Sequence, residues 1–182
     1  MRLFLAVFPS ADVQALAVRV ADALRTPGDG VSWVKRENLH YTLRFLGEVG
    51  ADGARRAREA AVEAAAAHAP FDAVLAAPGA FPDAKRARVL WLGMGEGAEA
   101  LAALARSLER ALGSRGFDRA DHRFTPHLTI GRVRAPGDWS AKLAAAPPID
   151  ARFRVGRIVL VKSTLSPGGS RYEIESAAPL AG

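Results

Sequence analysis

The chain contains no cysteine, only four histidines and four lysines among its 182 residues, and no apolar run long enough to cross a bilayer. The absence of cysteine excludes disulfides, thiolate metal sites and a cysteine nucleophile. The apolar start of the chain, residues 1–8, is too short for a signal peptide, and we interpret it as a buried strand. We therefore expect no membrane segment and a cytoplasmic location.

The charge is positive, with 25 basic against 19 acidic residues and a formal net charge of +6. A basic balance favours a polyanionic partner, and nucleic acid is the usual one. Subtracting the four lysines leaves 21 arginines, and alanine is also abundant. GC-rich coding DNA produces this combination without selection for binding. Charge alone therefore leaves contact with nucleic acid open.

The spacing of apolar residues predicts the secondary structure. Helices are expected at 12–24, 51–68, 96–112 and 139–143. Strands are expected at 2–8, 31–34, 39–46, 71–77, 88–92, 127–133, 152–165 and 172–175. Several strands follow one another across short turns. This order predicts an α+β fold with antiparallel or mixed sheets rather than a doubly wound parallel sheet.

One short pattern, a histidine and a threonine separated by an apolar residue and followed by an aliphatic one, occurs twice. Its copies are His40-Tyr41-Thr42-Leu43 and His127-Leu128-Thr129-Ile130. Because side chains alternate along a strand, the histidine and threonine of each copy share one face and the apolar pair the other. One copy alone would be a half-buried strand histidine beside a β-prone threonine. Two copies on predicted strands favour a catalytic pair.

The blocks that enclose the two copies, residues 33–48 and 124–132, resemble the two-histidine phosphoesterases. Within that superfamily they are most similar to the bacterial RNA 2′,3′-cyclic phosphodiesterases, also called 2′–5′ RNA ligases. Residues 88–93 and 163–169 extend the resemblance over most of the chain. It implies a single bilobal domain over residues 1–182 with pseudo-two-fold symmetry. Each lobe would place one His-x-Thr pair in a central cleft.

Opening a cyclic phosphodiester needs a base for the attacking water and an acid for the departing ribose oxygen. Histidine is the side chain whose ordinary pKa permits both roles near neutral pH. The resemblance implies that His127 is the base and His40 the acid that releases the 3′ oxygen, leaving a 2′-phosphate. The residues themselves do not decide between the two assignments. Thr42 and Thr129 are expected to donate hydrogen bonds to the non-bridging oxygens.

Two arginines are candidate substrate contacts, because a guanidinium binds phosphate bidentately. Arg132 matches a substrate-contacting arginine of the family, although strict alternation places it on the face opposite His127. Gly131 permits a bulge or a strand end that would remove this conflict. Arg44 shares the face of its own motif by alternation, and a surface position is the alternative.

The aromatic residues beside the motifs have simpler predicted roles. Tyr41 and Phe45 lie opposite the polar face and are expected in the core. Trp33 and Phe124 are expected to pack, with stacking on a base as the alternative.

The other two histidines are not assigned to catalysis. His68 ends a helix just before Pro70 and is expected to be structural. His122 lies beside Asp121, at a spacing that fits no common zinc site. We expect no metal and no cofactor.

The sequence thus predicts a monomeric hydrolase whose partner is RNA with a 2′,3′-cyclic phosphate end or a small cyclic nucleotide. Reversible 2′–5′ ligation would be an additional activity. Two alternatives stay open: a non-catalytic module that binds RNA ends or nucleotides, and a related phosphoesterase acting on another cyclic phosphate or 2′–5′ linkage. Turnover that depends on both histidines would distinguish the hydrolase from the binding module. A comparison of substrates would distinguish it from the related phosphoesterase.

Overall fold

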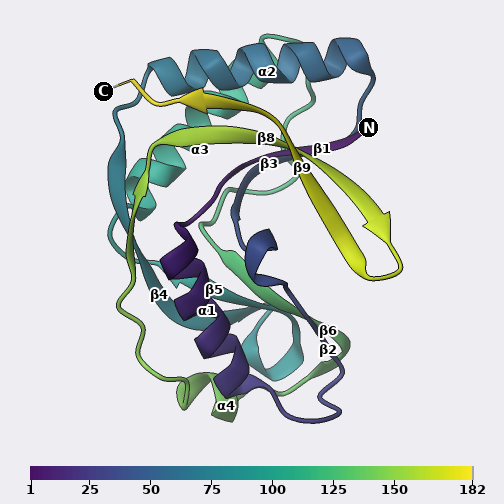
Figure 1. The fold of residues 1–182 in the computed structure, drawn as a ribbon, viewed down its shortest axis with the longest axis vertical. Helices are drawn as coiled ribbons and strands as arrows, with labels where there is room; N and C mark the ends of the chain where they lie inside the picture. Colours follow the sequence, from purple (N-terminus) through teal and green to yellow (C-terminus); the bar gives the residue numbers. More distant parts are fainter. Residues whose placement is uncertain (182) are drawn as a thin grey trace.

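A computed structural model describes residues 1–181, in which a curved antiparallel sheet is flanked by helices (Figure 1). The strands are β1 (Arg2–Val7), β2 (Val31–Trp33), β3 (Tyr41–Glu48), β4 (Phe71–Phe81), β5 (Ala87–Met94), β6 (Leu128–Gly137), β7 (Arg152–Val155), β8 (Arg157–Ser166) and β9 (Gly169–Pro179). The helices are α1 (Ala11–Leu24), α2 (Ala51–Ala66), α3 (Ala98–Gly113) and α4 (Ser140–Ala144), with 3-10 turns η1 (Arg36–Asn38) and η2 (Ala84–Arg86). The α+β prediction is confirmed.

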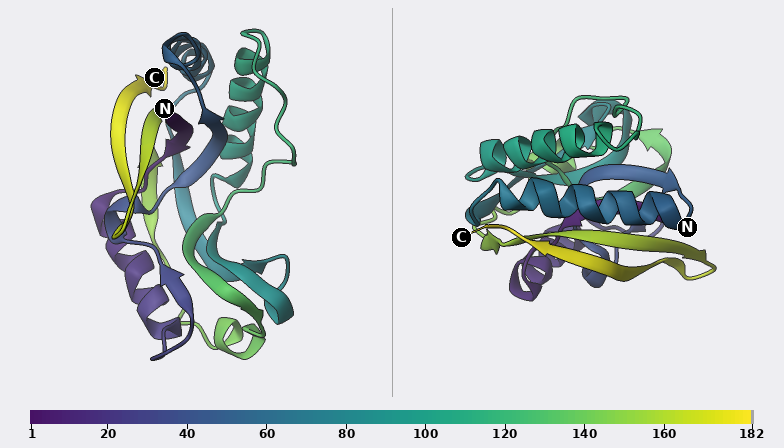
Figure 2. Two further views of the ribbon diagram at one scale, coloured as in Figure 1. Left: turned by 90° about the vertical axis from the view of Figure 1, so that its right-hand side faces the viewer. Right: turned by 90° about the horizontal axis from the view of Figure 1, so that it is seen from above.

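The sheet consists of two halves that meet between β3 and β6. Its strand order is β7-β4-β5-β6-β3-β1-β8-β9, with β2 added to β6. A single residue pair, Tyr41 with Leu128, joins β3 to β6. Helices α2 and α3 pack together, α2 against β8 and β9 and α3 against β3, whereas α1 contacts β6 (Figures 1 and 2). Each half of the sheet therefore has its own helical cover, which is the expected bilobal arrangement.

Helix α3 shows why these segments fold against the sheet. Its leucines at positions 101, 104, 108 and 112 recur at helical spacing, and each is at most 1% exposed. Burying such a side chain stabilises the fold by roughly 2 kcal/mol relative to leaving it in water. The buried face of α2 is made of alanines, whose small side chains let α2 and α3 lie close together.

The predicted helices agree with the observed ones to within two residues at each end. The predicted strand at 152–165 is two strands, because the chain changes partners at Gly156. Strand β7 pairs with β4, while β8 pairs with β1 and β9. The predicted strand at 39–46 begins later, at Tyr41, because the η1 turn comes before it. Among the described residues, no helix is both long and apolar enough to cross a membrane.

Candidate active site

The pair Tyr41–Leu128 brings the two His-x-Thr motifs together. Both of its side chains are fully buried, at 0% exposure. Directly opposed residues of an antiparallel pair point to the same face, and their neighbours along each strand point to the other. A register through this pair places His40 opposite Thr129 and Thr42 opposite His127. All four polar side chains therefore share the face opposite the buried pair.

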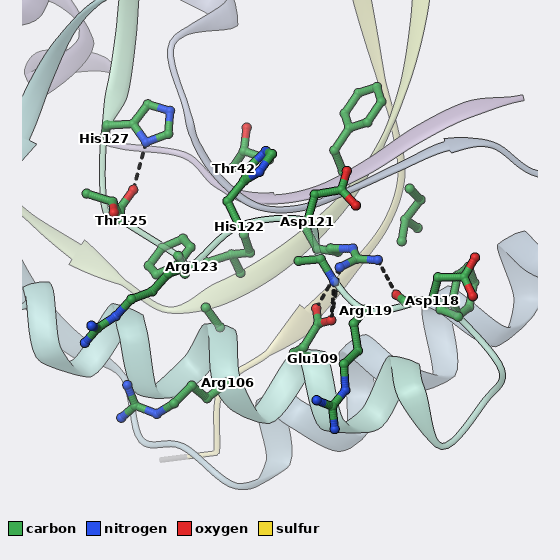
Figure 3. Close-up of a pocket in the computed structure, with 18 of the residues that line it drawn as sticks. Thr42, Arg106, Glu109, Asp118, Arg119, Asp121, His122, Arg123, Thr125 and His127 are labelled. Carbon is green, nitrogen blue, oxygen red and sulfur yellow. Dashed lines mark hydrogen bonds and ion pairs between the residues drawn. The ribbon is translucent and has the colours of Figure 1, made fainter. Parts of the chain in front are cut away.

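A backbone carbonyl two residues earlier orients each histidine. Nδ1 of His40 lies 2.6 Å from the Asn38 oxygen, and Nδ1 of His127 lies 2.8 Å from the Thr125 oxygen. Figure 3 shows the second of these contacts, with His127 and Thr42 on the same side of α3. A carbonyl only accepts hydrogen bonds, so Nδ1 carries the proton in both rings and Nε2 is free to gain or give one.

The η1 turn and the β8–β9 hairpin fix the carbonyl that holds His40. The Asn38 amide N–H donates to the Lys35 oxygen at 2.9 Å, and its side-chain nitrogen donates to the Ser170 oxygen at 2.9 Å. Nε2 of His40 lies 2.9 Å from the Thr42 hydroxyl, which donates to it when the ring is neutral. The ring is thus positioned at both nitrogens.

Aromatic side chains surround His40. Its ring centroid lies 4.8 Å from that of Phe4, 5.5 Å from Phe8 and 5.4 Å from Tyr172. Burial lowers the pKa of His40 to about 4, the neighbouring His127 and Arg132 act in the same direction, and the contact with the Asn38 carbonyl opposes them. At neutral pH His40 is therefore uncharged in the free protein.

His127 has a different neighbourhood. The edge of its ring meets Phe81 on β4, with 5.0 Å between centroids, and Phe81 in turn contacts Trp91 on β5 at 5.2 Å. Trp91 lies directly over Gly79, where a Cβ would come within 2.3 Å of the indole. A glycine at this position thus permits the stack that supports His127.

A β-bulge places Arg132 on the same face as His127. Along β5 and β6, Trp91 pairs with Thr129 and Leu90 with Gly131, so Ile130 is an extra residue that resets the alternation. Arg132 lines the same cavity as His127, and its charge acts on both His40 and Tyr172. The bulge that the sequence analysis allowed at Gly131 is centred one residue earlier.

The face predicted for Arg44 is wrong, and a second bulge is the reason, although Arg44 does line the same cavity as Thr42 and His127. Along β1 and β3, Ala6 pairs with Thr42 but Leu5 pairs with Arg44, so Leu43 is the extra residue. Arg44 therefore faces away from Thr42, toward α3. The same shift corrects the prediction for Phe45, which is 50% exposed instead of lying in the core.

An ion pair takes up the Arg44 guanidinium. It binds both carboxylate oxygens of Glu109 at 3.0 Å and also donates to the Asp118 carbonyl. Glu109 accepts a hydrogen bond from the Ala120 amide at 2.8 Å. The pair therefore holds the loop that leads from α3 to Thr125 and His127. Direct contact of Arg44 with substrate remains an untested prediction.

The other predicted residues are distributed as follows. Tyr41 is buried as expected, stacks on Phe153, and donates its hydroxyl to the Gly93 carbonyl at 3.0 Å. Trp33 packs against Trp139, as expected. Nε2 of His68 lies 2.8 Å from the Ser107 hydroxyl, which fits a structural role.

An open groove extends from the site along α3, with a volume of about 910 Å³. Thr42, His127 and Arg132 lie at one end of it, and Phe124 and His122 line it further along. Three of its arginines, at positions 106, 119 and 123, could not be predicted from the sequence, because nothing in the local pattern marks them. The aromatic wall around His40 was not predicted either. The alternation of Phe4 and Ala6 on one face of β1, continued by Phe8 just after the strand, was the available signal for that wall.

Known proteins match this chain over most of its length. The model of the 2′-5′ RNA ligase superfamily matches residues 4–166. The RNA 2′,3′-cyclic phosphodiesterase of Methanothermobacter thermautotrophicus is 32% identical over 94% of this chain and 95% of its own. The enzyme of that name from Thermotoga maritima is 33% identical over 96% and 92%.

Two solved structures share the whole fold. TT0787 of Thermus thermophilus superimposes with a TM-score of 0.85 at 30% identity, covering 99% of this chain and 98% of its own. E. coli LigT complexed with 3′-AMP gives a TM-score of 0.82 at 26% identity, covering 100% and 98%. With a family match over most of its length and full-length relatives above 30% identity, the chain belongs to the 2′-5′ RNA ligase superfamily.

Proposed function

We propose that this protein hydrolyses the 2′,3′-cyclic phosphate at RNA ends to a 2′-phosphate, using His40 and His127 as its acid and base. The observation that carries the proposal is the register through Tyr41–Leu128, because it gathers both His-x-Thr pairs on one face. The relatives named RNA 2′,3′-cyclic phosphodiesterase support the choice of substrate.

The proposed reaction is an in-line displacement at phosphorus. Nε2 of the base takes a proton from water as the water oxygen bonds to phosphorus. The bond from phosphorus to the ribose 3′ oxygen breaks, and Nε2–H of the acid protonates that oxygen. Thr42 and Thr129 donate to the non-bridging oxygens, where charge grows, and Arg132 neutralises the phosphate.

The assignment of the two roles has to account for the low pKa of His40. The family resemblance makes His40 the acid, yet at neutral pH it is uncharged in the free protein. A phosphate anion bound between the histidines raises the pKa of His40, because an opposite charge favours the protonated ring. We propose that His40 takes up its proton from solvent when the substrate binds, while the more accessible His127 acts as the base.

A substrate with sulfur in place of the 3′ oxygen tests this assignment. A thiolate leaves without being protonated, so the general acid is no longer needed. We expect the His40→Ala variant to regain most of the wild-type rate on this substrate and His127→Ala to remain inactive. Recovery of His127→Ala instead of His40→Ala would show that the roles are reversed.

The activity itself is tested with an oligoribonucleotide that ends in a 2′,3′-cyclic phosphate, incubated in EDTA. We expect a 2′-phosphate product, identified by mass and phosphatase sensitivity. Each single variant, His40→Ala or His127→Ala, should lower kcat/KM by about 10³-fold, within the range for loss of a general acid or base. Turnover that persists in both variants contradicts the mechanism. Binding of RNA without turnover by the wild type supports the binding-module alternative.

Several finer properties remain predictions with simple checks. We propose that the protein needs no metal, which the EDTA assay tests, and that it is a monomer, which gel filtration tests. Reversible 2′–5′ ligation is tested by supplying an RNA with a free 5′-hydroxyl. Other cyclic phosphates and 2′–5′ linkages, run beside RNA ends, test the related-phosphoesterase alternative. The cytoplasmic location is tested by cell fractionation.

A further inference from the structure

The groove beside the two histidines is larger than a terminal cyclic phosphate requires. Its volume of about 910 Å³ lies near the upper end of the range for sites that enclose whole small ligands. It continues from His127 and Arg132 between β3, α3 and the loop after α3 (Figure 3). The space thus leads from the reacting phosphate onto the surface of α3.

The charge of this groove is positive, and four of its five arginines have no partner among the described residues. Arg106, Arg119, Arg123 and Arg132 line it, and in the described part of the chain their guanidinium groups make no ion pair or hydrogen bond with protein. Asp118 and Asp121 are the opposing carboxylates, since Glu109 is bound to Arg44. Elsewhere, arginines such as Arg55 and Arg152 are bound to carboxylates. Four free cations against two carboxylates leave a surplus for an anionic ligand.

The backbone that carries two of these arginines is tied to the rest of the fold before any ligand arrives. In Figure 3, Arg106 and Arg123 extend to the same side of α3, and Arg119 lies further along the helix. Arg119 and Arg123 belong to the loop that the Arg44–Glu109 pair ties to α3. Pre-ordering of this kind lowers the entropic cost of binding.

The opposite flank of the site has a different chemistry. There His40 is enclosed by Phe4, Phe8 and Tyr172, which offer ring surfaces and no cation. Aromatic rings suit an unpaired base, and arginines suit backbone phosphates. The aromatic flank therefore suits the terminal base of an RNA, and the arginine flank suits its backbone phosphates.

We propose that the groove binds the RNA chain on the 5′ side of the cyclic end, with Arg106, Arg119 and Arg123 contacting its backbone phosphates. This inference rests on the proposed function and adds the path of the RNA chain across the protein surface. The preferred substrate is a single-stranded oligoribonucleotide, and a cyclic mononucleotide fills only the catalytic end of the site.

A second exposed cationic pair provides a matched control. Arg36 lies on η1 and Arg171 on β9, two elements that the Asn38–Ser170 hydrogen bond joins. Neither guanidinium has a carboxylate partner among the described residues, and neither lines the groove. If the RNA left the site past this hairpin, these two arginines would carry its phosphates.

The experiment compares Arg106→Gln/Arg123→Gln with Arg36→Gln/Arg171→Gln on two substrates. One is uridine 2′,3′-cyclic phosphate, and the other is a single-stranded RNA of about six nucleotides with the same end. Removing two phosphate contacts should lower kcat/KM for the longer RNA about tenfold, through KM, and change the mononucleotide less than about twofold. The hairpin variant should match the wild type on both substrates.

Salt dependence gives a second readout, and direct binding of the product RNA with its 2′-phosphate end gives a third. The logarithm of the binding constant falls with the logarithm of the salt concentration, with a slope of about 0.7 for each phosphate contact. Between roughly 50 and 200 mM salt, the fold-loss of affinity should therefore be about sevenfold smaller for the groove variant than for the wild type. An unchanged groove variant, or a loss confined to the hairpin variant, overturns the inference while the proposed function stands. The wild type could also turn over neither substrate while the groove variant binds the product RNA more weakly than the wild type does. That result would support the RNA-binding role of the groove and refute the proposed hydrolase activity.

Discussion

At the residue scale, the two histidines share one motif but have different surroundings. His40 lies among Phe4, Phe8 and Tyr172, and burial there lowers its pKa to about 4. In the unfolded chain the same ring titrates near its ordinary value of about 6.5. Between these two values the unfolded state binds the additional proton, so acid destabilises the fold through this residue.

This difference predicts a measurable effect of pH on stability. The contribution of His40 is complete above about pH 6.5 and is lost as the pH falls toward 4. We expect the free energy of unfolding of the wild type to fall by about 2 kcal/mol more than that of His40→Asn between about pH 7 and pH 4.5. Asparagine keeps a donor for the Asn38 carbonyl and removes the titration. Urea unfolding at the two pH values measures the difference, and equal falls in both proteins would contradict the assigned pKa.

At the element scale, the Arg44–Glu109 pair connects β3, α3 and the loop that carries the second motif. The Arg44 side chain is 11% exposed and that of Glu109 33%, so the pair is partly screened by water. Removing Arg44 leaves the Glu109 charge partly buried and releases the Asp118 carbonyl, and removing Glu109 leaves the Arg44 charge largely buried and releases the Ala120 amide. Loss of either partner therefore destabilises the loop as well as the ion pair.

A double-mutant cycle tests this role. We expect Arg44→Met to lower the free energy of unfolding by about 2 kcal/mol, below the range for a fully buried pair. Glu109→Gln keeps an acceptor for the Ala120 amide, and the cycle should give a coupling of about 1 kcal/mol. Both single variants should lower kcat in the same direction, because each frees the loop before His127. A rise in KM for Arg44→Met alone would instead favour direct contact with substrate.

At the scale of the whole molecule, one continuous core runs beneath both halves of the sheet. The main cluster includes Leu3 and Leu5 of one half and Leu90 and Leu92 of the other. Trp33, Trp91 and Trp139 all lie in or beside the half that contains β6, whereas α2 and α3 cover the other half. Tryptophan fluorescence therefore reports on the half that contains β6, whereas far-UV circular dichroism is weighted toward α2 and α3.

We expect the protein to unfold in one cooperative step, as a single domain does. Tryptophan fluorescence and far-UV circular dichroism should give the same midpoint in urea. The physical reason is that neither half can open without exposing the shared core. Separate midpoints would show that the halves are independent units and contradict the prediction of one domain over residues 1–182.

The parts of the structure that the sequence predicted are those set by local pattern. Helix positions follow from apolar spacing, and the shared face of each His-x-Thr pair follows from alternation within three residues. The faces of Arg44 and Phe45 were mispredicted, and Arg132 could be placed only by allowing a bulge. These faces depend on bulges at Leu43 and Ile130, which arise from pairing with distant strands.

The groove, too, could not be predicted from local sequence pattern. Its arginines come from α3 and from the loop after it, and only the fold brings them next to His127. In the sequence they could not be told apart from the other arginines of a basic chain.

The single pair that joins β3 to β6 has a consequence for the direction of the reaction. In the proposed mechanism, each of the two motifs joined at Tyr41–Leu128 supplies a histidine and a threonine to the phosphorus, so the motifs themselves impose no direction of proton flow. That direction is set by the two neighbourhoods, aromatic enclosure at His40 and an open arginine-lined approach at His127. A ribose hydroxyl that enters in place of water meets the same groups. In the proposed mechanism, hydrolysis and 2′–5′ joining therefore follow one trajectory in the same sense, and the nucleophile that enters, water or a ribose 5′-hydroxyl, decides between them.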